Sequence, residues 1–476
     1  MRFRKHVSFF MVLATSFLLA QNKQVLYDFT EIPQALAVNP GMETDFQWFA
    51  GVPLLSGISG HAGTNGITVN DIFADDGLDI NDKVRDLMVN GLTTRDEFSQ
   101  ALQVDLFYGG FRNPYSDVFY SFGAYLEMDN ILYWPQDYAV LAFEGNANQL
   151  NRRFNLGDLK TRGSMVAVYH FGINKKINKQ LTAGARAKLY SGITDYNATN
   201  NKGYLENTEG QNNSIATTLS ADLQFRNSGF GALRNAENQG TLASTFLKRA
   251  IFGGDLGLGM DLGFTYRLNE RTAITGSVLD LGFIYHSGNV YKYNLKGNAT
   301  VEGIQINVLQ ELANLNRDFW QDLVDDLEEF IPFETTNSPY ITFRQTRINA
   351  SIRHGFGKPI GSVEACDCGP GASDSRAIKF RNEIGAHVFA INRPRGPQVA
   401  LTGFYLRRFG RFMALKGTYT VDKFSRTNVG VGLNLQAGPL NFYLMGDNLL
   451  SYQNIASSNY ASFQLGLNII SWGGKR

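Results

Sequence analysis

The last strand-like run of the chain, Tyr460–Trp472, alternates between apolar residues and polar or small ones. One face carries the apolar side chains Phe463, Leu465, Leu467 and Ile469. The other face carries Gln464, Gly466 and Asn468. A period of two is the pattern of a β-strand with two unlike faces. Because the pattern recurs along the chain, it favours an all-β fold, a transmembrane antiparallel β-barrel with lipid outside and water inside. A soluble all-β secreted protein is the alternative.

Strand-like runs that follow this pattern can be counted along the chain. They lie at about 46–55, 102–108, 118–128, 164–173, 180–193, 214–226, 256–267, 272–286, 341–354, 378–391, 398–409, 411–422, 426–437, 439–449 and 459–472. These are 15 runs, and a single-chain bacterial barrel usually has an even number of strands. We therefore predict about 14 strands, within a range of about 12 to 16. The alternation of up and down strands fails between residues 174 and 256, which indicates a wrongly assigned run there.

The run at 180–193 carries two cations on one face. Arg186 and Lys188 lie opposite a face of alanines and leucines. A cation on the lipid face would cost about 2–4 kcal/mol at the bilayer midplane. We therefore predict that Arg186 and Lys188 face the lumen, or lie near the membrane surface.

Residues 1–20 are typical of a cleavable signal peptide. Three basic residues precede an apolar stretch at 7–19, and Ala20 precedes a cut at Gln21. Removing it takes three of the 44 basic residues and none of the 43 acidic ones, which leaves 41 against 43, or a net charge of −2. That balance argues against a nucleic-acid partner. The remaining chain, 21–476, reads as one barrel domain in the outer membrane of a Gram-negative bacterium.

Three segments depart from the strand pattern. The N-terminal segment 21–45 contains Asn39 and Pro40, which predict a bend that packs inside the barrel or enters its first strand. Residues 60–100 form a polar excursion with one short helical piece. The insertion 287–340 contains an amphipathic helix at about 308–330 with an acidic opposite face. This helix either caps the mouth of the barrel or serves partner docking or gating.

The two cysteines, Cys366 and Cys368, are separated by one residue. In an oxidising envelope the pair is a strained disulfide, half of a metal site or a contact point for a partner. We favour a disulfide that stiffens the loop, and we expect replacement of both by serine to leave barrel assembly intact. Two thiolates without a nearby histidine are a weak metal signal, so we predict no metal site.

Residue patterns for catalysis are lacking. None of the five histidines after the signal peptide lies in a G-x-S-x-G or H-E-x-x-H motif. A phospholipase built on a strand Ser and His remains a distant alternative. We predict a protein that is not an enzyme and needs no cofactor.

Five segments together resemble a known family: 35–41, 51–54, 257–263, 278–284 and 438–448. They look like the FadL-type outer-membrane barrels of Bacteroidota. Within that group the chain is similar to an uncharacterised family whose neighbours include the PorV and PorP/SprF proteins of type IX secretion and gliding. The resemblance implies a barrel of about 14 strands with an N-terminal segment that enters the lumen. It does not imply fatty-acid transport, because no ligand-binding residue of the transporters can be matched here.

Two functions are left by these observations, besides the distant enzyme. The favoured one is a non-enzymatic porin-like barrel that anchors or assembles a secreted or surface protein, with a link to type IX secretion. The alternative is a FadL-like channel or transporter for small or hydrophobic solutes. The expected partners are outer-membrane lipid and, for the first function, that secreted or surface protein. The sequence makes no prediction about the oligomeric state.

Overall fold

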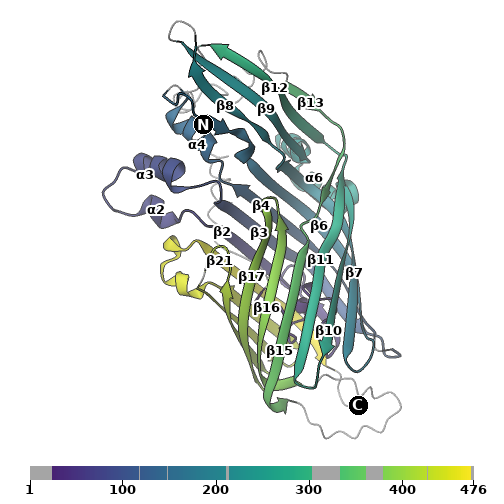
Figure 1. Cartoon of the computed structure of the whole chain (residues 1–476). Helices are drawn as coiled ribbons and strands as arrows, with labels where there is room; N and C mark the ends of the chain where they lie inside the picture. Colours follow the sequence, from purple (N-terminus) through teal and green to yellow (C-terminus); the bar gives the residue numbers. More distant parts are fainter. Residues whose placement is uncertain are drawn as a thin grey trace, which may run out of the picture.

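The computed structural model describes residues 24–116, 118–146, 148–210, 214–302, 333–360, 379–425 and 427–472. These residues form a closed antiparallel β-barrel of 14 strand positions, as the strand pattern predicts (Figure 1). The first position is divided into β1 (Phe46–Gly51) and β2 (Ile58–Thr64), and both pieces pair with the last strand, β21 (Tyr460–Trp472). This pairing closes the sheet, so the barrel has no free edge.

The other barrel strands follow in chain order, and each pairs with its neighbour. They are β3 (Glu97–Arg112), β4 (Val118–Tyr133), β6 (Lys160–Lys176), β7 (Leu181–Ala198), β10 (Asp255–Arg267), β11 (Thr272–His286), β14 (Tyr340–Phe343) with β15 (Arg347–Ile360), β16 (Lys379–Arg393), β17 (Gly396–Phe409), β18 (Met413–Val421), β19 (Asn428–Ala437) and β20 (Leu440–Asp447).

The outer face of the barrel is apolar, as β10 illustrates. Leu256, Leu258 and Leu262 are 41–59% exposed, whereas Asp261 and Thr265 on the other face are 0% and 1% exposed. In water this arrangement would expose the apolar residues and bury the charged ones. It suits a strand that faces lipid on the outside and polar groups inside.

Among the described residues, no helix is long and apolar enough to cross a membrane.

A second group of strands continues the sheet beyond one end of the barrel (Figure 1). It consists of β5 (Arg153–Asn155), β8 (Lys202–Glu209), β9 (Ile215–Ser228), β12 (Val290–Glu302) and β13 (Phe333–Thr336). The predicted run at 214–226 corresponds to β9, which pairs along its length with β8 and β12 and at only three positions with β7. Assigning it to the barrel was therefore wrong, and removing it turns 15 runs into the observed 14.

Short helices occupy the excursions between strands. They are α2 (Val69–Phe73), α3 (Ile80–Asp86), α4 (Gln136–Glu144), α5 (Phe230–Asn238) and α6 (Leu242–Lys248). The helical piece predicted within residues 60–100 is confirmed by α3. The predicted insertion 287–340 contains the long strand β12, which the sequence analysis missed. The signal peptide, the predicted helix at about 308–330 and the pair Cys366 and Cys368 lie outside the described residues.

Candidate functional site

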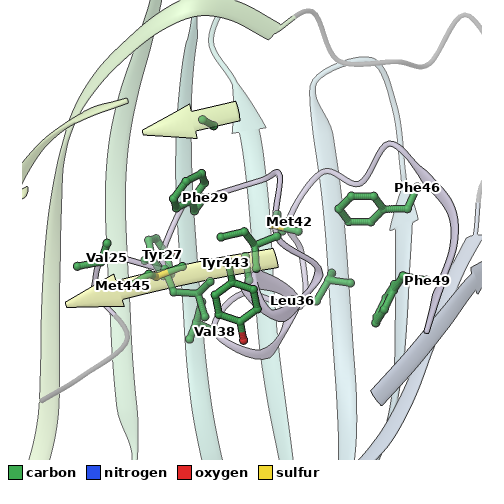
Figure 2. Packing of buried hydrophobic residues seen from close by; sticks show 14 of the residues in the cluster. Val25, Tyr27, Phe29, Leu36, Val38, Met42, Phe46, Phe49, Tyr443 and Met445 are labelled. Atoms are coloured by element: carbon green, nitrogen blue, oxygen red, sulfur yellow. The ribbon is translucent and has the colours of Figure 1, made fainter. Parts of the chain in front are cut away.

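Residues 24–45, called the plug below, lie inside the barrel and form none of its strands (Figure 2). A short 3-10 helix, η1 (Pro33–Ala37), begins at Pro33, where a missing N–H costs nothing. Apolar plug side chains pack against residues of the wall in one buried cluster. Its members include Tyr27, Phe29 and Leu36 of the plug with Leu406, Tyr443 and Met445 of β17 and β20. The plug therefore closes part of the lumen with a packed apolar core.

The plug is acidic and the wall around it is basic. Residues 24–45 contain the four acids Asp28, Glu31, Glu43 and Asp45 and no Lys or Arg. Each acid lies within 4 Å of a cation on a barrel strand. These cations are Arg267 of β10, Arg353 of β15, Lys379 of β16 and Arg408 of β17. The plug is thus attached to four different strands by opposite charge.

Two of these pairs have short contacts. The two carboxylate oxygens of Glu43 accept hydrogen bonds from Nε and Nη2 of Arg267, both at 2.6 Å. Glu31 accepts from Nε of Arg408 at 2.6 Å and lies 3.3 Å from Nζ of Lys379. Glu31 belongs to the plug and not to a membrane-spanning strand. Burial alone would raise the pKa of its carboxyl group, but Arg408 and Lys379 outweigh burial and lower this pKa to about 2.

Asn39 and Pro40 lie directly against the wall. The side chain of Asn39 accepts from the Gly41 N–H at 2.9 Å and donates to the carbonyl of Phe264 at 3.3 Å. Asn174 of β6 donates to the carbonyl of Pro40 at 2.6 Å. A side chain at Gly184 of β7 would collide with the Pro40 carbonyl, and one at Gly263 of β10 would collide with Asn39. These wall glycines therefore make room for the plug.

Arg186 and Lys188, the two cations singled out from the sequence, lie on the inner side of β7 and are 3% and 4% exposed. Nε of Arg186 donates to Asp261 at 2.7 Å, and Nη2 donates to the plug carbonyl of Ala37, also at 2.7 Å. Nζ of Lys188 lies 3.0 Å from Asp261 and 2.6 Å from Asp280. The structure thus brings both cations together with two aspartates, and it links one of them to the plug.

The chain of charges continues around the wall through residues that the sequence analysis did not single out. Arg347 lies 3.4 Å from Asp280 and 2.5 Å from Glu127, and Glu127 also accepts from Arg344 at 2.8 Å. Each residue sits in a predicted strand or beside one, and Glu127 lies on the inward face of β4 between Tyr125 and Asp129. An inward charge within a strand run was the only available sequence signal, because the partners are far apart in the chain.

A cavity remains between the plug and the wall. Its lining includes Gln24 of the plug and His61, Gln103, Glu127, Lys188 and Arg347 of the wall, besides apolar side chains such as Phe389 and Phe463. Its volume is about 90 Å³, enough for several water molecules but below the ~300–1,000 Å³ typical of ligand pockets. In this conformation, this cavity therefore has room for water-sized guests but not for a typical ligand.

A separate buried network lies where β11 meets the strands beyond the barrel. Asp255 lies 3.0 Å from Nδ1 of His286, and Nε2 of His286 lies 2.7 Å from the hydroxyl of Thr342. The order acid, imidazole and hydroxyl is that of a hydrolase triad. However, all three residues are 5% exposed or less, so a substrate does not reach the hydroxyl in this conformation. The network ties β10, β11 and β14 together.

Comparisons with known proteins found solved structures of low sequence similarity. No curated protein sequence matches the chain. Among solved structures, the toluene transporter TodX of Pseudomonas putida has 10% identity and a TM-score of 0.38, covering 96% of this chain and 95% of TodX. The toluene transporter TbuX of Ralstonia pickettii has 11% identity, a TM-score of 0.38 and 92% coverage of both chains. A FadL homologue of Pseudomonas aeruginosa has 9% identity, a TM-score of 0.37 and 90% coverage of both chains. At these scores the likeness supports no inference about function.

One sequence family also matches most of the chain. The family covers residues 40–447, which is 408 of the 476 residues and includes nearly the whole barrel. The chain therefore belongs to the family described as "Family of unknown function (DUF5723)".

Proposed function

We propose that this protein is an outer-membrane channel, closed by its own plug, that passes a small solute when the plug moves. The observation that carries this proposal is the charge arrangement between plug and wall. All four acids of the plug contact cations of the wall, and no plug residue takes part in the barrel sheet. The plug can therefore leave its position without breaking any strand pairing.

The size of the barrel supports the same function. Eight strands enclose a lumen that side chains fill, whereas 16 to 18 strands leave an aqueous channel. A barrel of 14 strands lies between these cases, so its interior needs additional material to be closed. The plug supplies that material, and moving it would open a path through the lumen.

The lining of the cavity bears on the class of solute. Charged groups such as Glu127, Lys188 and Arg347 alternate there with apolar groups such as Phe389 and Phe463. A purely apolar solute would leave the charged groups without solvent, which is costly. We infer that the solute carries both a polar and an apolar part.

The sequence favours an anchor or assembly partner for a secreted or surface protein, with a link to type IX secretion. No contact among the described residues and none of the comparisons supports that role. The channel, which was the alternative, accounts for the plug and its ion pairs, and we prefer it for this reason. The assembly role remains a prediction that co-purification of a stoichiometric partner would revive.

The test is conductance in a planar bilayer, with a variant that displaces the plug without touching its charges. Gly184→Val places a side chain where the Pro40 carbonyl lies, so we expect it to conduct while the wild type conducts poorly. Gly403→Val is the matched control, because a side chain at this barrel glycine meets nothing within 4 Å. Both variants should fold, which a gel can show: a folded barrel resists detergent and migrates faster in an unheated sample than in a boiled one.

Release of the plug is measured separately by endoproteinase Glu-C, which cuts after Glu31 and Glu43. Faster cleavage of folded Gly184→Val without conductance would refute the channel. A large, steady conductance of the wild type would refute closure by the plug.

A further inference from the structure

A helical hairpin packs against the outside of the barrel wall. It comprises α5, α6 and the following π-helical turn η5 (Arg249–Gly253), and it is called the outer hairpin below (residues 230–253; Figure 1). Leu233, Phe246 and Ala250 of the outer hairpin form one apolar cluster with wall residues. The wall residues of this cluster are Leu126 of β4, Met165, Ala167 and Tyr169 of β6 and Ile193 of β7.

The alternation along β6 shows that this cluster lies on the lipid side. Asn174 points inward, because it donates to plug carbonyls. Phe171 and Ile173, on the opposite face, are 48% and 45% exposed. Ala167 and Tyr169 share the face of Phe171, since side chains two residues apart point the same way. The outer hairpin therefore covers the external surface of the wall and not the mouth of the barrel.

The outer hairpin is fixed to the wall by hydrogen bonds as well as by apolar contacts. Nε of Arg249 donates to the Ile193 carbonyl at 2.7 Å, and its Nη2 lies 3.2 Å from Asp255. The hydroxyl of Ser191 donates to the Arg249 carbonyl at 2.6 Å, and that of Tyr169 donates to the Ala250 carbonyl at 3.0 Å. The position of the apolar residues beside Arg249 is therefore built into the fold.

Three apolar side chains near the end of the outer hairpin remain exposed. Leu247, Ile251 and Phe252 are 57%, 60% and 46% exposed. Phe252 adopts φ 58°, a strained conformation for a bulky residue, and its ring lies 4.6 Å from that of Tyr169.

The exposed residues are continuous with the apolar belt of the barrel. Leu256 and Leu258 of β10 follow the outer hairpin directly in the chain and are 47% and 59% exposed on the outer face. Lys248, also exposed, stands between Leu247 and the buried Arg249. A lysine beside an apolar surface typically extends its ammonium group to the water boundary.

We propose that the outer hairpin is a lipid-binding surface: Leu247, Ile251 and Phe252 contact the acyl chains of the nearest leaflet, and Lys248 marks the headgroup level. The occupant is lipid and not protein because the patch continues the lipid-facing belt without interruption. The relevant leaflet lies at the barrel end opposite the tight turns at 268–271, 410–412 and 438–439. This inference concerns the outside of the barrel and does not depend on the channel proposal.

The test uses the wild-type protein in phosphatidylcholine vesicles that contain a lipid with a photoactivatable diazirine in its acyl chain. After illumination, mass spectrometry locates the lipid adducts. We expect adducts on 247–252 at a yield within about threefold of that on 256–262 of β10, the positive control. The exposed turn at Gln239 and Gly240 is the negative control and should carry none.

Adducts on β10 without adducts on 247–252 would overturn the proposal. A bifunctional amine reagent tests the patch separately: cross-links between two copies of the chain through Lys248 would also overturn the proposal, because a protein would then occupy the patch. A further variant, Ile251→Lys, should lower the adduct yield on 247–252 at least fivefold in folded protein and leave that on 256–262 unchanged. An unchanged yield on 247–252 in this variant would count against a specific acyl contact.

Discussion

Glu43 of the plug and Arg267 of β10 form a bidentate ion pair, with both oxygen–nitrogen distances at 2.6 Å. The planar guanidinium matches the carboxylate at two points, so this pair fixes an orientation as well as a distance. Its side chains are 14% and 17% exposed, and bulk water screens it only partly. The pair holds the end of the plug at the point where the chain enters the first barrel strand.

Reversing either charge of this pair should open the channel. We expect Glu43→Arg to lose about 1.5–3 kcal/mol of plug attachment, which raises the open-to-closed ratio roughly 10- to 100-fold. Single-channel recording in a planar bilayer measures that ratio. Combining Glu43→Arg with Arg267→Glu restores the opposite charges and should restore most of the closure. The exposed residue Glu209 offers the control substitution Glu209→Arg, which should change nothing.

Arg353 also contacts Glu43, at 3.2 Å, so the swapped pair retains one unfavourable neighbour and closure will be incomplete. If the double swap opens the channel as strongly as Glu43→Arg alone, the pair does not hold the plug.

A reciprocal pair of buried amides gives a second, uncharged test of plug attachment. Gln34 donates to Asn468 at 2.7 Å and accepts from it at 3.0 Å, and it also donates to the Ser56 carbonyl at 2.7 Å. Gln34→Leu leaves these buried partners partly unsatisfied, at a cost of about 1–3 kcal/mol. We expect the rate of Glu-C cleavage in the plug to rise roughly 5- to 100-fold, because cleavage follows the population of the open form.

Gln239→Leu, at an exposed turn, is the control for added apolar surface. A cleavage rate in Gln34→Leu that equals this control would show that the amide pair contributes little to plug attachment.

The strands could be predicted from the sequence because lipid and lumen impose opposite demands on alternate residues. β10 carries Leu256, Leu258 and Leu262 outward, and this alternation is readable without a structure. The same alternation led to the wrong assignment of β9 as a barrel strand, because a half-buried strand beyond the barrel has the same period of two. The break between β1 and β2 could not be recognised in the sequence either, because Pro53 and Leu54 look like part of one apolar run.

The partners within the site were not predictable, because register decides them. Arg186 and Asp261 are 75 residues apart in the chain, and they meet only because β7 pairs with β10 in one particular register. Glu127 of β4 and Arg344, in the break between β14 and β15, are 217 residues apart in the chain and belong to segments that do not pair with each other. A periodic pattern indicates which face a residue occupies, but not which residue lies opposite.

Replacing the cations Arg186 and Lys188 should affect assembly before it affects conduction. Substituting Glu at both positions would bring four carboxylates together, since Asp261 and Asp280 already lie there. Removing one partner of a buried pair typically costs about 3–5 kcal/mol. We therefore expect Arg186→Glu with Lys188→Glu to lose the heat-modifiable form on gels. Adding Asp261→Asn and Asp280→Asn to these changes should recover part of it. Normal assembly of the double Glu variant would contradict the buried ion pairs.

An opened lumen should prefer anions. Once the plug leaves, its four acids leave with it, whereas Arg267, Arg353, Lys379 and Arg408 stay on the wall. Glu383 remains beside Arg353 and Arg408 and compensates only part of this charge. Charges on a pore wall bias the ions that pass beside them, so chloride should pass more readily than potassium. The reversal potential of Gly184→Val in a KCl gradient measures this preference.

Adding Lys379→Glu and Arg408→Glu to Gly184→Val should weaken or reverse the preference for anions. Cation selectivity of Gly184→Val itself would mean that the plug does not leave these wall cations exposed.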